Sequence, residues 1–135
     1  MERIDAIRRV LESRADVRLA YVFGSAARGE ARVSSDVDLA VLFEPLPEAR
    51  DLDRLAADLQ TGAGRRVDLV VLNTAPPLLA REILKTGRCL ACRSEAERVG
   101  FEARAMARYM DTAHLRRVQD RYLRERAEAF RAHRS

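Results

Sequence analysis

Hydrophobic positions along this chain follow two spacings, one typical of helices and one typical of strands. Apolar residues recur every three or four positions in segments that predict helices, at residues 2–14, 52–60 and 76–85. Continuous β-rich runs predict three strands, at residues 17–23, 36–43 and 67–72. Helices interleaved with three strands predict an α/β or α+β fold, in which a small sheet is covered by helices.

The last third of the chain is predicted to form a helical tail. A short extended stretch at residues 88–92 precedes a helical pattern that continues to about residue 130. A break is expected near Asp111, where Thr112 would cap a new helix. The apolar stripe of this tail is expected to cover the sheet, with a partner helix as the alternative. The stripe consists of Met106, Tyr109, Met110, Leu115 and Val118.

Length and composition predict one domain over residues 1–135, with a core at about 1–92 and the helical tail at about 93–135. The 135 residues are 47% hydrophobic and 34% charged, which is typical of a soluble globular protein. No apolar run approaches the ~20 residues that a membrane span requires. The first residues lack the cationic start of a signal peptide, so we expect an intracellular, cytoplasmic protein.

Charge and cysteine content give weaker signals. A net charge of +4 suits a protein that handles phosphates or contacts RNA, and equally one with a solvated basic face. Cys89 and Cys92 have the spacing of a redox pair, but zinc needs about four ligands and no second cysteine pair exists. We expect them to be small apolar fillers in an extended segment. Tyr21, in the first predicted strand, is expected to be a packing residue.

Carboxylates stand where strands usually exclude them. Asp36 and Asp38 begin the second predicted strand, and Asp68 begins the third. Alternation places Asp36 and Asp38 on one strand face, roughly 7 Å apart. Three such groups repel one another unless water or a cation intervenes, and all-oxygen donors suit Mg²⁺ or Mn²⁺. The alternative is that the first two acids lie at the solvent edge of the strand and the third follows a loop.

A glycine–serine turn precedes these acids. Gly24 and Ser25 end the first predicted strand, and a helix starting there would direct free N–H groups toward a ligand. These donors, with the Ser25 hydroxyl and the cation of Arg28, are suited to terminal phosphate oxygens. Beside a divalent-metal cluster, such a turn predicts a metal–triphosphate site.

The spacing of these residues resembles that of a known superfamily. Gly24-Ser25, ten intervening residues and Asp36-x-Asp38, with Asp68 on a later strand, resemble the nucleotidyltransferases that include polymerase β. The longer string GSAARGEARVSSDVDLAVLF resembles their minimal branch, and within it the MntA-type antitoxins. The stretch FEARAMARYMDTAHLRR resembles the helical tail of those antitoxins, so the likeness covers essentially the whole chain. It implies the small mixed sheet of that superfamily.

The resemblance also implies a reaction and a role for each residue. Asp36, Asp38 and Asp68 would be the catalytic, metal-binding residues and would hold two Mg²⁺ ions, with Asp68 nearest the attacking hydroxyl. Gly24, Ser25 and Arg28 would bind the β- and γ-phosphates. The reaction is attack on the α-phosphorus of a nucleoside triphosphate with release of pyrophosphate.

The antitoxin branch implies a partner as well. Its members silence a helical HEPN-type ribonuclease toxin by transferring AMP from ATP to a tyrosine of that toxin, within a hetero-oligomeric complex. Direct nucleic-acid binding and membrane contact are not expected. Two alternatives stay open: transfer to a small-molecule or RNA hydroxyl, and a non-catalytic antitoxin that occludes its toxin.

Overall fold

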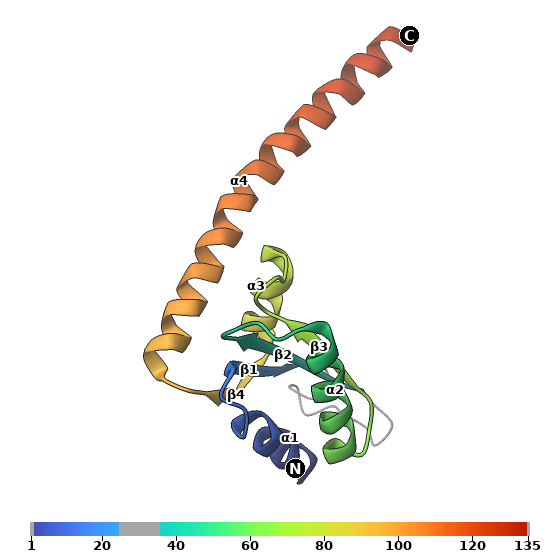
Figure 1. Ribbon diagram of the computed structural model, residues 1–135. Coiled ribbons are helices and arrows are strands. Elements are labelled where there is room, and N and C mark those ends of the chain that lie inside the picture. The colour runs from blue at the N-terminus through green and yellow to red at the C-terminus, as the bar shows by residue number, and fades with distance from the viewer. Residues whose placement is uncertain (1, 25–35, 135) are drawn as a thin grey trace.

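A four-stranded mixed sheet forms the centre of the computed structural model, which describes residues 2–24 and 36–134 (Figure 1). The strands lie in the order β3-β2-β1-β4, with β1 antiparallel to both neighbours and β2 parallel to β3. They are β1 (Val17–Phe23), β2 (Val37–Phe43), β3 (Val67–Val71) and β4 (Arg88–Cys92). The three expected strands are confirmed within a residue of their predicted ends, and the stretch at 88–92 forms a fourth strand.

Helices cover both faces of this sheet. They are α1 (Glu2–Glu12), α2 (Ala49–Ala63), α3 (Pro77–Thr86) and α4 (Glu95–Arg134). Helix α2 makes the crossover that two parallel strands require. It runs through Gly62 and stops at Gly64, whose φ of 69° is left-handed and whose N–H donates to the Gln60 carbonyl at 2.9 Å. The predicted fold class, a small mixed sheet covered by helices with a helical tail, is confirmed.

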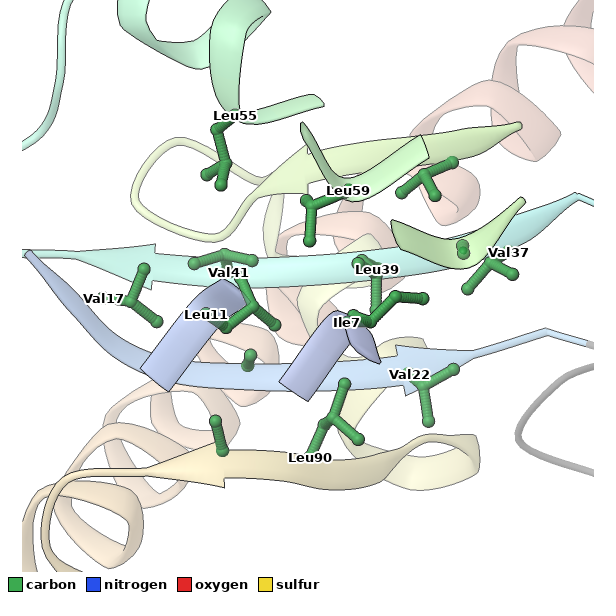
Figure 2. Packing of buried hydrophobic residues seen from close by; sticks show 14 of the residues in the cluster. Ile7, Leu11, Val17, Val22, Val37, Leu39, Val41, Leu55, Leu59 and Leu90 are labelled. Atoms are coloured by element: carbon green, nitrogen blue, oxygen red, sulfur yellow. The ribbon is translucent and has the colours of Figure 1, made fainter. Parts of the chain in front are cut away.

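One face of the sheet is closed by α1 and α2. Figure 2 shows side chains of α1 and α2 directed at side chains of β2. The labelled set includes Ile7, Leu11, Leu55, Leu59, Val37, Leu39 and Val41. Every one of these seven residues is almost fully buried. Because strand side chains alternate, the odd-numbered positions of β2 supply this core and the even-numbered ones face away from it.

The other face is covered by α3 and the first turns of α4. Leu19, Tyr21 and Ala40 of the sheet pack there with Ile83 of α3 and Phe101 of α4. The Tyr21 hydroxyl donates a hydrogen bond to Glu102 Oε1 at 2.8 Å, so this ring joins β1 to α4. The expected packing role of Tyr21 is confirmed, and its pKa is raised by burial and by the hydrogen bond to Glu102.

Strand β4 contains a bulge. Ala91 pairs with Ala20 and Cys89 pairs with Tyr21, which leaves Leu90 as the extra residue. Leu90 and Ala91 are both buried, although they are consecutive. The carbonyl of Leu90 accepts a hydrogen bond from Arg8 Nε of α1 at 3.1 Å.

The two cysteines lie on the same strand. Cys89 and Cys92 are free thiols and are exposed. The expectation that they fill apolar space is therefore wrong. The bulge explains the difference, because Leu90 and Ala91 take the buried positions and leave both cysteines outside the core.

Helix α4 differs from its prediction in two respects. It is one helix of 40 residues, and Thr112 hydroxyl donates to the Tyr109 carbonyl at 2.8 Å within it, so there is no break at Asp111. The expectation that its stripe covers the sheet is also wrong. Most of the stripe is exposed, with exposed fractions of 46% for Met106, 64% for Met110, 57% for Leu115 and 48% for Val118.

No helix in the described ranges has the length and apolarity needed to cross a bilayer.

Candidate functional site

Two of the predicted acids stand side by side on neighbouring strands. Asp38 is the second residue of β2, Asp68 is the second residue of β3, and the parallel register pairs them directly. Adjacent strands lie about 4.8 Å apart, so their side chains leave the sheet as close neighbours. Val37 and Val67, one position earlier, are buried among the apolar residues of the α1/α2 face. Both carboxylates therefore project from the opposite face, at the end of the sheet where β2 and β3 begin.

The third acid lies just outside the sheet. Asp36 precedes β2, is exposed, and has the same parity as Asp38. Burial raises the pKa of Asp38, and the charges of Asp68 and Asp36 raise it further, in that order. The three carboxylates thus interact electrostatically at Asp38. Such a concentration of negative charge is unfavourable in isolation and is relieved by a cation.

The glycine turn that was predicted to lie near these acids is adjacent to Asp38. Gly24 directly follows β1 and has a φ of 70°, a left-handed conformation that favours glycine. A methyl group on its Cα would lie 2.4 Å from Asp38 Oδ2, closer than any side chain can approach. Phe23, the preceding residue, pairs with Asp38 across the β1–β2 ladder. Because glycine has no Cβ, the Asp38 carboxylate can occupy the space next to position 24.

The remaining two predicted phosphate ligands lie outside the described residues. Ser25 and Arg28 fall within 25–35, so their predicted roles stay predictions.

One basic residue at the site was not predicted from the sequence. Arg66 Nε lies 3.5 Å from Asp68 Oδ1, and the Arg66 carbonyl accepts a hydrogen bond from the Val37 N–H at 2.9 Å. The side chain is 72% exposed, so this ion pair is largely solvated. The sequence did contain a signal for this contact. Arg66 stands two residues before Asp68, so both side chains lie on the same strand face.

The donor chemistry of this group fits a hard divalent cation. Carboxylate oxygens are the ligands that Mg²⁺ prefers. Such an ion would neutralise the negative charges of Asp68 and Asp36 that act on Asp38. Within residues 2–24 and 36–134, no three His, Cys, Asp or Glu side chains are arranged closely enough to hold a metal ion. The metal-binding assignment of Asp36, Asp38 and Asp68 stays a prediction.

Comparison with known proteins identifies the class. The profile of the polymerase beta nucleotidyltransferase family matches residues 5–96, which include the glycine turn and all three acids. The chain belongs to this family. A relative, protein adenylyltransferase MntA from Thermococcus cleftensis, is 37% identical over 89 residues, which cover 63% of this chain and 90% of the relative.

Solved structures of toxin–antitoxin complexes share the fold. A chain of a toxin–antitoxin complex with AMP-PNP superposes with a TM-score of 0.77 at 24% identity, covering 89% of this chain and 98% of that one. A chain from the complex of a tri-AMPylated Shewanella oneidensis HEPN toxin with its MNT antitoxin has a TM-score of 0.72 at 23% identity, covering 90% and 96%. The coverage extends the shared fold into the long C-terminal helix.

Proposed function

We propose that this protein is an adenylyltransferase that transfers AMP from ATP to a tyrosine hydroxyl of a HEPN-type toxin, and thereby acts as its antitoxin. The observation that carries the proposal is the in-register pair Asp38–Asp68, with Gly24 against Asp38. A family relative named as a protein adenylyltransferase supports the protein acceptor. Structural neighbours that hold AMP-PNP or an AMPylated HEPN toxin support the nucleotide and the partner.

The proposed reaction exchanges one phosphate ester bond for another. The tyrosine oxygen forms a bond to the α-phosphorus of ATP, the bond from that phosphorus to the β-phosphate oxygen breaks, and pyrophosphate leaves. Mg²⁺ ions bound by Asp36, Asp38 and Asp68 would supply Lewis-acid stabilisation of the phosphate charge. Asp68, at the exposed side of the pair, accepts the proton of the tyrosine hydroxyl.

Other residues of the site act on charge and space. Gly24 keeps the strand end close to Asp38 without obstructing its carboxylate. Arg66 offsets the charge of Asp68 from the solvent side. Ser25 and Arg28 bind the terminal phosphates in this proposal.

The test is transfer of label from α-labelled ATP to the cognate HEPN-type toxin. We expect labelling by the wild type and a loss of at least ~100-fold in the Asp36→Asn/Asp38→Asn variant, since the acids act on the transition-state charge. Asp53→Asn, an exposed substitution on α2, is the matched control and should label normally. Normal transfer by the double variant would refute the proposed site.

The same assay separates the alternative functions. Labelling of a small molecule or of an RNA 3′ end by the purified protein alone would replace the protein acceptor. Undiminished protection of cells from the toxin by an Asp36→Asn/Asp38→Asn/Asp68→Asn variant would favour occlusion over catalysis.

A further inference from the structure

Helix α4 leaves the rest of the molecule about halfway along its length. Its first turns are anchored by Phe101 and Ala105, which are 7% and 5% exposed. The last firm contact is Tyr109, whose ring lies 4.8 Å from the guanidinium carbon of Arg81 on α3. From residue 114 to residue 131, every side chain except that of Arg116 is exposed. Figure 1 shows this part of α4 projecting from the sheet on the side of α3.

The projecting part carries an apolar face, which we call the distal stripe: Leu115, Val118, Tyr122 and Leu123. Leu115, Val118 and Tyr122 are separated by three and four residues, so they share one face of the helix, with Leu123 beside them. Their exposed fractions are 57%, 48%, 56% and 62% in chain order. Contiguous exposed apolar surface of this kind marks an interaction site.

The opposite face of the same segment is polar. It forms a shallow charged surface made of Arg117, Asp120, Arg121, Arg124, Glu125 and Glu128. The segment is therefore amphipathic, and its apolar side stays exposed in the part of the chain that the structure describes. Water solvates the charged side chains of the polar face. The distal stripe is apolar, and burial against a partner would remove it from water.

The size of the stripe favours a partner that also contacts the body of the protein. Its four residues expose on the order of 400 Å², about half of the roughly 800 Å² per partner that a standard interface buries. A second copy paired only along the stripe would fall short of this area. A protein acceptor gains the rest, because its hydroxyl must also reach Asp38 and Asp68. These acids project from the sheet face that α3 covers, and α4 projects to that side.

Charge indicates the chemistry of the partner surface. Arg108 lies seven residues before Leu115, and Arg126 lies four residues after Tyr122, so both are in line with the stripe. The Arg126 guanidinium carbon is 5.6 Å from the Tyr122 ring, and Arg126 Nη1 donates to the Tyr122 hydroxyl at 2.9 Å. The other arginines near the stripe differ in position, since Arg117, Arg121 and Arg124 belong to the polar face. A complementary surface is apolar and flanked by carboxylates.

We propose that the distal stripe docks an amphipathic, acid-flanked helix of the acceptor protein and holds that protein while its hydroxyl lies at the carboxylate site. This inference rests on the proposed function. It adds a docking surface that is separate in sequence from the residues that perform the chemistry.

The experiment measures binding and nucleotide affinity on the same full-length variants. Leu115→Glu/Tyr122→Glu places charge on the stripe, and Arg117→Gln/Arg124→Gln is the matched control on the polar face. Titration calorimetry against the cognate HEPN-type toxin gives the Kd of the complex, and titration with AMP-PNP gives the Kd of the nucleotide. Circular dichroism verifies that α4 stays helical.

We expect the stripe variant to weaken the protein complex at least tenfold and to keep its AMP-PNP affinity, whereas the control variant keeps both. Equal complex affinity in the stripe variant and the wild type would overturn the docking proposal. So would a stripe variant that only converts a wild-type dimer into a monomer, since the occupant would then be a second copy. Failure of the wild type itself to bind the HEPN-type protein would instead refute the proposed function.

Discussion

The two faces of the sheet are made from alternate residues of the same strands, but they differ in what they bury. The face under α1 and α2 is entirely apolar and almost completely buried. The face under α3 and α4 also holds Asp38, Asp68 and the hydrogen-bonded pair Tyr21–Glu102. One face thus supplies most of the packing energy, and the other can carry polar groups whose arrangement is unfavourable for stability. Neighbouring residues 38 and 39 test this division directly.

Leu39→Ala should have the largest effect on stability. Leu39 is fully buried on the α1/α2 face, so removing its side chain leaves a cavity and should lower the free energy of unfolding by about 3 kcal/mol. Urea denaturation measures the change. Leu115→Ala, where the leucine is 57% exposed, is the matched control and should change stability by less than ~0.5 kcal/mol. Equal losses in the two variants would contradict the assignment of the core.

Tyr21→Phe should have a smaller effect on the other face. The ring stays packed, but the hydrogen bond to Glu102 is lost, which should cost about 1 kcal/mol. Glu102 keeps its contacts with Arg98 Nη1 at 3.1 and 3.2 Å, so its carboxylate is not left alone. Tyr122→Phe, on the exposed part of α4, is the control in the same denaturation experiment. An unchanged midpoint for Tyr21→Phe would show that this bond does not join β1 to α4 in solution.

Asp38→Asn should have the smallest effect on stability, and one of opposite sign. The pKa of Asp38 is raised by burial and then by Asp68 and Asp36, so the folded protein binds this proton more tightly than the unfolded chain. Wild-type stability therefore falls as pH rises from the ordinary aspartate pKa through the raised folded value. Asparagine removes that loss, and above this window the variant should melt about 2 °C higher.

Calorimetric melting curves of both proteins across this pH range provide the measurement. The difference in Tm should grow with pH and then level off. A variant that is less stable than the wild type at neutral pH would show that the carboxylate is stabilising in the free protein. If an Asn variant loses transfer and gains Tm, the wild-type carboxylate provides activity at the expense of stability.

Strand periodicity made much of the site predictable. The alternation at Val37 and Asp38 correctly assigns their faces, because each side chain direction depends only on its own strand. The pairing of Asp38 with Asp68 was not predictable, since the periodicity of each strand does not reveal its register with a strand that follows a crossover helix. Arg66 was missed although its position two residues before Asp68 already placed the two side chains on one strand face.

Two errors have a common cause in tertiary context. The cysteines were assigned to apolar space because the sequence does not reveal the bulge, which gives the buried positions of β4 to the consecutive residues Leu90 and Ala91. The stripe of α4 was assigned to the sheet because helical spacing shows which residues share a face and not what covers that face. Both errors occur where the surroundings of an element decide its exposure.

The bulge in β4 has a consequence for how this protein behaves at high concentration. An outermost strand offers unpaired backbone groups onto which another chain can add, which is a common start of aggregation. At Leu90 the ladder is locally irregular, and the guanidinium of Arg8 already occupies the carbonyl. A regular incoming strand would have to displace that arginine and match an irregular partner. The bulge that leaves both cysteines outside the core therefore also guards the margin of the sheet against edge-to-edge association.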